Sequence, residues 1–142
     1  MGNWIFIAPI VGVIALIFAL FLSKKVSREE AGTDRMKEIA EAISDGAHAF
    51  LTAEYRILVI FIVVLFVLIA VGIGVGSGIA FVAGTLCSIL AGYFGMSVAT
   101  KANVRTANAA RTSGMNRALS IAFSGGAVMG MSVVGLGLLG VS

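Results

Sequence analysis

Charged residues are scarce in this sequence, and long stretches have none. They make up 12% of its 142 residues, against about 25% in an average soluble domain. None occurs from Ile57 to Thr100 or from Ala118 to Ser142, and the seven acids all lie between Glu29 and Glu54. A soluble domain of this size has too much surface for its volume to bury such long apolar runs. The sequence therefore predicts an integral membrane protein.

Cysteine and histidine each occur only once, which excludes several kinds of site. Cys87 has no second cysteine for a disulfide, and together with His48 it cannot supply the ligands of a zinc centre. The phosphate-binding pattern Gly-x-x-x-x-Gly-Lys-Ser is absent too. The net charge of +3 does not indicate nucleic acid, because Lys and Arg routinely flank membrane spans. We expect no metal ligands in this chain and no nucleic-acid partner.

Four apolar stretches predict membrane spans, at about residues 4–22, 55–72, 79–99 and 118–139. A helix needs about 20 apolar residues to cross a hydrocarbon core of about 30 Å. Four alternating glycines from Gly72 to Gly78 divide the long uncharged stretch into two helices joined by a short hairpin. The expected fold is an all-α polytopic helix bundle, with residues 1–142 forming one membrane domain.

The first apolar run resembles either a permanent anchor or a cleaved secretory signal. A signal begins with basic residues and ends at a small-residue cleavage site. Here Met1–Trp4 is uncharged, whereas Lys24 and Lys25 follow the run. This order favours an anchor that stays in the protein, with its N-terminus outside.

The basic residues also predict the orientation. Residues 23–56 carry six Lys or Arg and residues 101–117 carry four, whereas the glycine hairpin carries none. Since positive loops stay on the cytoplasmic side, the loop and helix extension 23–54 and the loop 100–117 are predicted to be cytoplasmic. Both ends of this chain then face outward.

Part of the first cytoplasmic segment has a helical pattern. Ser27–Glu30 has the spacing of a capping box, and Ala31–Thr33 indicates a break. Apolar residues then recur at helical spacing at Met36, Ile39, Ala40, Ile43, Ala47 and Phe50. We predict one amphipathic helix that continues into the second span, with Thr33 or Asp34 as its N-cap.

The third and fourth spans are rich in small residues at helical spacing, which let helix backbones approach closely in lipid. The residues expected to pack against other helices are Gly84, Ser88, Gly92, Gly126 and Gly130. Four helices offer few faces for so many small residues. The pattern therefore predicts neighbouring helices that this chain does not contain.

No predicted span carries an ionisable residue near its centre. Ion-conducting and proton-relaying helices normally hold such a residue at membrane depth. The absence argues against an ion pathway in these spans, against a rotor-ring subunit, which needs a mid-span carboxylate, and against a channel-forming bundle, which needs a polar lining.

Two polar stretches contain the candidate site residues. In the second cytoplasmic segment, Lys101, Arg105 and Arg111 alternate with Asn103 and other uncharged polar residues. These residues either meet lipid phosphates or brace a cytoplasmic site for an anionic ligand. Glu54 and Arg56 flank Tyr55 at the predicted water–lipid boundary, as an interfacial anchor or as partners of that basic segment.

Three stretches resemble membrane-integral pyrophosphatases, in order along the chain. Gly46-Ala-His-Ala-Phe-Leu-Thr-Ala-Glu-Tyr55 is similar to that family's Gly-Ala-x-Ala-Phe-Leu-x-x-Glu-Tyr motif. Two further matches run from Gly95 to Arg111 and from Ala118 to Gly130, the last followed by a glycine-rich stretch from Val133 to Gly140. The resemblance covers most of the chain after Ser44.

The resemblance implies a homodimeric, Mg²⁺-dependent pump that hydrolyses inorganic pyrophosphate and exports H⁺ or Na⁺, with possible K⁺ dependence, in a prokaryotic cell membrane. This chain would supply N-terminal helices of the outer ring. The family's catalytic Asp-rich motifs are absent, so no catalytic or metal-binding residue carries over, and this chain alone is expected to be inactive. Structural positions do carry over and are expected to brace the cytoplasmic funnel: Glu54, Tyr55, Asn103, Arg105 and Arg111.

The alternative is a small non-enzymatic membrane protein, an accessory or assembly subunit. The lack of ionisable residues within the spans favours it, and the three ordered motifs argue against it. The sequence leaves open the choice between H⁺ and Na⁺ and the question of K⁺ dependence.

Overall fold

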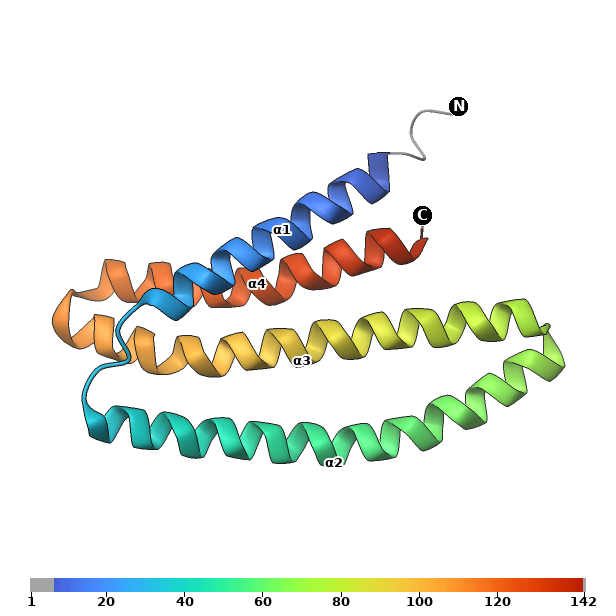
Figure 1. Ribbon diagram of the computed structural model, residues 1–142, viewed down its shortest axis with the longest axis horizontal. Helices are drawn as coiled ribbons and strands as arrows, with labels where there is room; N and C mark the ends of the chain where they lie inside the picture. Colours follow the sequence, from blue (N-terminus) through green and yellow to red (C-terminus); the bar gives the residue numbers. More distant parts are fainter. Residues whose placement is uncertain (1–6, 142) are drawn as a thin grey trace.

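The computed structural model describes residues 7–141, which form four helices with short connections (Figure 1). The helices are α1 (Ile7–Arg28), α2 (Asp34–Gly72), α3 (Val75–Thr112) and α4 (Met115–Val141). Each is long and apolar enough to cross a membrane, and no strand occurs among the described residues. The predicted all-α, four-span architecture is confirmed; the first three residues of the predicted first span lie outside the described part.

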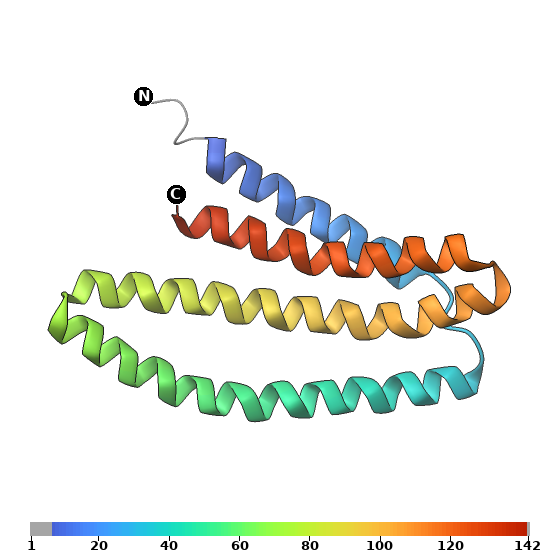
Figure 2. The ribbon, with the colours of Figure 1, turned by 180° about the vertical axis from the view of Figure 1, so that it is seen from behind.

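The two middle helices are much longer than a membrane span. At 39 and 38 residues, α2 and α3 extend about 58 Å, nearly twice the thickness of the hydrocarbon core. Figures 1 and 2 show them running antiparallel along the molecule, with α4 and then α1 on the other side of α3. The prediction that one helix continues from residue 34 through the second span is confirmed.

Two predictions about the helix ends are wrong. The expected loop 100–117 is helical except for Ser113 and Gly114, because its Ala-rich sequence contains no glycine or proline before Gly114. The backbone turns at Gly114, whose φ is +87°, a conformation that favours glycine. Ser27 does not begin a helix either, since α1 continues through it to Arg28.

The start of α2 agrees with the sequence pattern. Thr33 is its N-cap, and the Thr33 hydroxyl accepts a hydrogen bond from the backbone N–H of Met36 at 3.4 Å. Asp34 follows in the first turn, where its negative charge interacts favourably with the positive end of the helix dipole. At the other end, only Ile73 and Gly74 separate α2 from α3. The predicted glycine hairpin is therefore a tight turn, with Gly74 at a φ of +142°.

The core lies between α1, α3 and α4. Its buried residues are Ala19, Leu22, Val26, Val98, Ala102 and Val128. By contrast, α2 contacts only α3 among the described elements, and Leu51 is its one buried residue. The molecule therefore consists of a three-helix unit with α2 against one side.

Glycines lie where helices approach closely, but they are not the glycines singled out in the sequence analysis. A Cβ at Gly135 would lie 2.9 Å from the backbone oxygen of Gly12, and one at Gly125 would lie 2.7 Å from the Cβ of Ala102. A Cβ at Gly84, Gly126 or Gly130 would meet no neighbouring atom within 4 Å, and one at Gly92 would meet only the hydroxyl of Tyr55, at 3.8 Å. Gly84 and Ser88 line an open groove of about 280 Å³ with residues of α4. Their packing against further helices stays a prediction.

Candidate functional site

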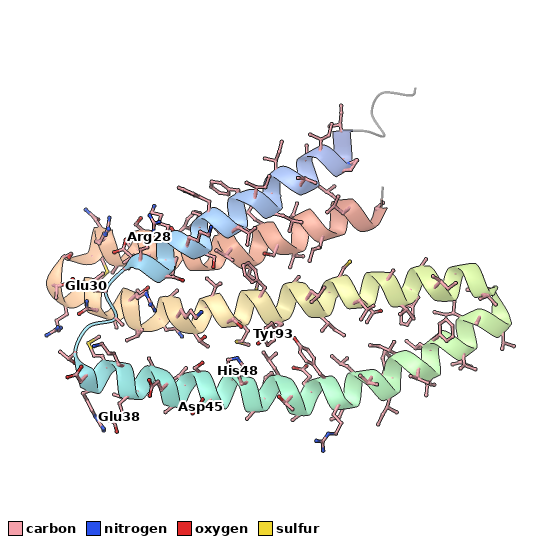
Figure 3. The ribbon with its side chains drawn as sticks, in the orientation of Figure 1. Arg28, Glu30, Glu38, Asp45, His48 and Tyr93 are labelled. Atoms are coloured by element: carbon pink, nitrogen blue, oxygen red, sulfur yellow. The ribbon has the colours of Figure 1, made fainter. Side chains whose placement is uncertain are left out.

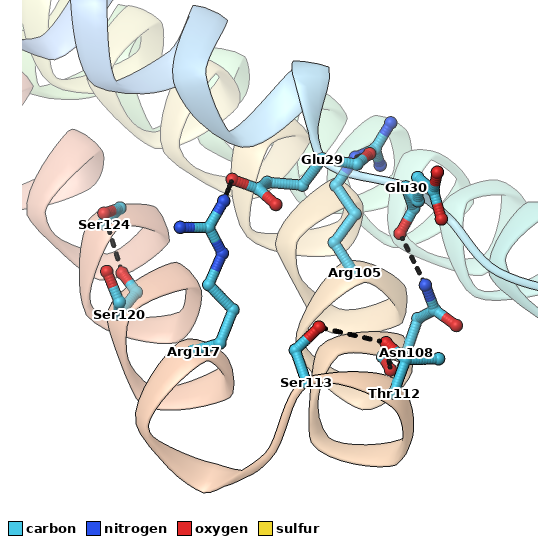
Figure 4. Close-up of polar contacts among 9 residues, drawn as sticks. All are labelled: Glu29, Glu30, Arg105, Asn108, Thr112, Ser113, Arg117, Ser120 and Ser124. Atoms are coloured by element: carbon cyan, nitrogen blue, oxygen red, sulfur yellow. Dashed lines mark hydrogen bonds and ion pairs between the residues drawn. The ribbon is translucent and has the colours of Figure 1, made fainter.

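Polar side chains of α3, of α4 and of the connection after α1 gather where α1 ends, close to the turn between α3 and α4 (Figure 4). Arg105 of α3 reaches the C-terminal end of α1. Its Nε donates to the carbonyl oxygen of Glu29 at 3.0 Å, and its Nη2 donates to that of Ser27 at 3.4 Å. The last carbonyls of a helix lack partners within the helix, and the C-terminal dipole attracts a positive charge. Arg105 therefore caps α1 and ties it to α3.

Asn108, one turn further along α3, holds the connection that follows α1. Its side chain is buried, and Nδ2 donates to the carbonyl oxygen of Glu30 at 3.3 Å. Its Oδ1 accepts a hydrogen bond from Nη2 of Arg111 at 3.2 Å. Gly32 packs so closely that a Cβ there would lie 2.8 Å from Asn108 Oδ1, and its φ is +90°. The connection thus fits against α3 in one conformation.

An ion pair joins the same end of α1 to α4. Nη2 of Arg117 lies 2.6 Å from Oε1 of Glu29. Beside this pair is a polar hollow of about 360 Å³. Its lining residues are Arg28, Glu29, Glu30, Arg105, Asn108, Ala109, Thr112, Ser113, Arg117 and Ile121. Three guanidinium groups and two carboxylates therefore surround one opening at the charged end of the bundle.

Only two of the five predicted site residues meet here, Arg105 and Arg111. Asn103 is exposed and lines an apolar groove between α2 and α3. The Tyr55 hydroxyl donates to the carbonyl oxygen of Ile89 at 3.2 Å, and Glu54 beside it is exposed. Ile89 lies 16 residues before Arg105 on α3, a separation of about 24 Å. Glu54 and Tyr55 therefore belong to a different part of the bundle.

Sequence reasoning did not single out Glu29, Asn108 or Arg117 as site residues. Asn108 lies three residues from both Arg105 and Arg111, so helical spacing along α3 places all three on one side of that helix. Treating residues 100–117 as a loop concealed this signal. The pairing of Glu29 with Arg117 depends on the packing of α1 against α4, and no local pattern indicates it.

The single histidine lies on α2, away from this cluster. Figure 3 shows His48 facing Tyr93 of α3, and their ring centroids are 6.1 Å apart. Its Nδ1 lies 2.8 Å from the carbonyl oxygen of Ser44 one turn earlier. His48 is exposed.

No group of three His, Cys, Asp or Glu side chains comes together within residues 7–141. Glu29 and Glu30 both line the polar hollow, but they share it with three arginines, and Glu29 is already paired with Arg117. Mg²⁺ prefers several oxygen ligands and no competing cations. The described residues therefore do not fit a Mg²⁺ site.

The helices and the polar cluster define a class: a multi-pass helical membrane protein whose charged helix ends are tied together on one side. Comparison with known proteins narrows this class. The family profile described as inorganic H⁺ pyrophosphatase matches residues 13–142. The chain belongs to this family.

Named relatives are ion pumps of two kinds. The chain is 57% identical over 131 residues to a putative K⁺-stimulated pyrophosphate-energized sodium pump of Clostridium tetani, covering 92% of the chain and 19% of the relative. It is 49% identical over 144 residues to a K⁺-insensitive pyrophosphate-energized proton pump of Methanosarcina mazei, covering all of the chain and 21% of the relative. It thus spans about a fifth of the length of these relatives. Both ion types occur among them, so similarity does not choose between H⁺ and Na⁺.

Proposed function

We propose that this chain forms scaffold helices of a pyrophosphate-energised cation pump. The family match over residues 13–142 is the observation that carries the proposal. The similarity to pumps that are about five times longer supports a role as one part of such a machine. In this role the chain sits in the outer ring, and other parts of the pump bind pyrophosphate and the transported ion.

The polar cluster gives this scaffold a mechanical role. Arg105 and Asn108 fix the end of α1 against α3, and Arg117 fixes it against α4. Arg111 supports Asn108 in turn. We infer that these contacts keep the cytoplasmic helix ends in register beside the funnel in which pyrophosphate is hydrolysed. Glu54, Tyr55 and Asn103 act along α2 and α3, where Tyr55 links the two helices.

The remaining features of the proposal come from the family resemblance. The pump is a Mg²⁺-dependent homodimer, and its Mg²⁺ ligands lie outside this chain because the described acids do not fit the ion. The basic helix ends face the cytoplasm of a prokaryotic cell and the N-terminus faces outward. The pump depends on K⁺ if it is of the K⁺-stimulated type and does not if it is of the K⁺-insensitive type, both of which occur among its relatives.

Ion uptake by inverted membrane vesicles tests the proposal. Vesicles from cells that produce the protein should accumulate H⁺ or Na⁺ when pyrophosphate and Mg²⁺ are added, and vesicles from a strain lacking its gene should not. Equal uptake by both strains would refute the pump role. An accessory subunit would instead leave part of the uptake in the deletion strain.

The activity of the 142-residue chain by itself is a separate test. Purified in nanodiscs, it should release no phosphate from pyrophosphate in the presence of Mg²⁺, because the resembling segments contain no catalytic motif. Mg²⁺-dependent phosphate release by this preparation would contradict a purely scaffolding role.

A further inference from the structure

The hollow at the charged end of the bundle has free hydrogen-bonding capacity in its arginines. A guanidinium group has five N–H donors. Arg105 uses three of them on backbone carbonyls, and Arg117 uses one on Glu29. The side chain of Arg28 makes no hydrogen bond or ion pair to the described residues, although it lines the same hollow. Donors from three helices are thus available to a ligand there.

The acids of the hollow do not cancel this capacity. Glu29 is neutralised by Arg117 at 2.6 Å and is tucked in, with 20% of its side chain exposed, whereas Arg117 is 53% exposed. Glu30 also lines the hollow, so three guanidinium groups face two carboxylates there and leave one net positive charge. The Thr112 hydroxyl donates to the carbonyl oxygen of Asn108 at 2.9 Å and lies 3.3 Å from the Ser113 hydroxyl, so the free donors of the lining belong to the arginines. A small anion with several oxygens would find donors on more than one side.

The position of the hollow along the helices places it near the expected membrane surface. The uncharged runs of α1 and α3 end at Lys24 and Lys101. Arg28 and Arg105 each follow one turn later, about 6 Å further from the hydrocarbon. The headgroup layer on each side of a bilayer is about 5–7 Å thick. With the hydrocarbon boundary placed at the ends of these two runs, Arg28 and Arg105 lie at the level of lipid phosphates.

We propose that this hollow binds a phosphate group, held by Arg28, Arg117 and the unused donors of Arg105. Guanidinium groups suit this ligand because their planar N–H pairs match two phosphate oxygens. The height of the hollow favours the headgroup of an anionic phospholipid. The same chemistry would accept a free phosphate ion from the cytoplasm.

Native mass spectrometry of the whole 142-residue chain in detergent tests the site. With phosphatidylglycerol added, we expect one lipid retained per chain, and about tenfold weaker retention after Arg28→Ala or Arg117→Ala, because each removes a charge-assisted contact. Lys24→Ala is the matched control, since it removes one nearby positive charge that does not line the hollow. Phosphatidylcholine, which has no net charge, should be retained weakly by every variant.

Titration with inorganic phosphate or pyrophosphate distinguishes the two sources of the ligand. Phosphatidylglycerol binding that depends on Arg28 and Arg117 assigns the site to a lipid. Binding of inorganic phosphate alone, with the same dependence, assigns it to a free ion. Equal loss in Lys24→Ala and the two arginine variants would mean general surface charge and would overturn the proposal, as would the absence of both kinds of binding. The result is independent of pump activity.

Discussion

Helices α4 and α2 are both long and apolar, but the rest of the chain holds them very differently. In the most apolar part of α4, 33% of the residues are buried, whereas none are buried in the corresponding part of α2. Small residues explain the contrast, since Gly125, Ser132 and Gly135 let α1 and α3 approach α4. The apolar part of α2, residues 57–72, consists mainly of large Ile, Val, Leu and Phe side chains. Small residues therefore mark the helices that pack within this chain, and large ones mark the surface left for lipid or other helices.

Helix α2 also carries charges at a level where the neighbouring helix α3 is uncharged. Residues 57–72 of α2 are uncharged over about 24 Å, less than the thickness of a hydrocarbon core. The contact of Tyr55 with Ile89 places Glu54 and Arg56 about 17 Å from the level of Thr100, where the uncharged run of α3 ends. Helix α2 thus brings two charges beside uncharged α3 residues. Such charges require water or polar partners, so the polar part of α2 is not a lipid-facing surface.

The largest expected effect is at the contact between α1 and α4. Gly135→Ala places a methyl group 2.8 Å from Leu16 Cγ and 2.9 Å from the backbone oxygen of Gly12. A backbone oxygen cannot shift without moving the helix that carries it. Overpacking of this kind destabilises by about 1–3 kcal/mol. Thermal unfolding in detergent should show the loss. Gly137→Ala is the control, because a Cβ there meets nothing within 4 Å, and equal losses in both variants would contradict the packing described for α4.

Removal of the α1 cap should destabilise the protein by less than the upper end of that range. Arg105→Ala leaves carbonyls of Ser27 and Glu29 without their charged donor, and we expect a loss of about 2 kcal/mol. Hydrogen exchange should rise in residues 26–33 and leave the far end of α4 unchanged. Lys101→Ala, an exposed residue one turn away, is the control. Arg105→Lys should restore little, since one ammonium group cannot reach the same carbonyls together. Unchanged stability and exchange in Arg105→Ala would refute the bracing role.

Composition and apolar run lengths were enough to predict the four helices, because lipid requires long uncharged stretches. The extension of α2 followed from apolar spacing and the N-cap at Thr33. The end of α3 was missed because residues 100–112 are polar, and polar residues were taken as a loop although none of them breaks a helix. Arg105 and Arg111 were found from their charge. Asn108, the partner of Arg111, lies one turn away on the same helix, but Arg105 binds backbone carbonyls that only the packing of α1 against α3 brings near, so the form of the site could not be predicted.

A smaller effect is expected where α2 meets α3. Tyr55→Phe removes the hydrogen bond to Ile89 and should cost about 0.6–1 kcal/mol. Because α2 contacts no other described helix, the change should appear as a wider or broader α2–α3 distance, measured by spin labels on the two helices, and not as global unfolding. Tyr93→Phe is the control, since the Tyr93 hydroxyl donates no hydrogen bond to the described residues. A distance distribution identical to that of the parent chain would show that α2 is held by its apolar contacts alone.

The smallest effect belongs to the ion pair between α1 and α4. Glu29→Gln removes the carboxylate that Arg117 contacts but keeps a similar shape. Because Arg117 is half exposed, water and salt screen the pair, and the expected loss is under about 1 kcal/mol. The difference from the parent chain should shrink as salt is raised. Glu38→Gln removes a more exposed acid of α2 and should have a still smaller effect. A loss from Glu29→Gln as large as that from Arg105→Ala would mean that the ion pair, and not the capping of α1, holds this end of the three-helix unit together.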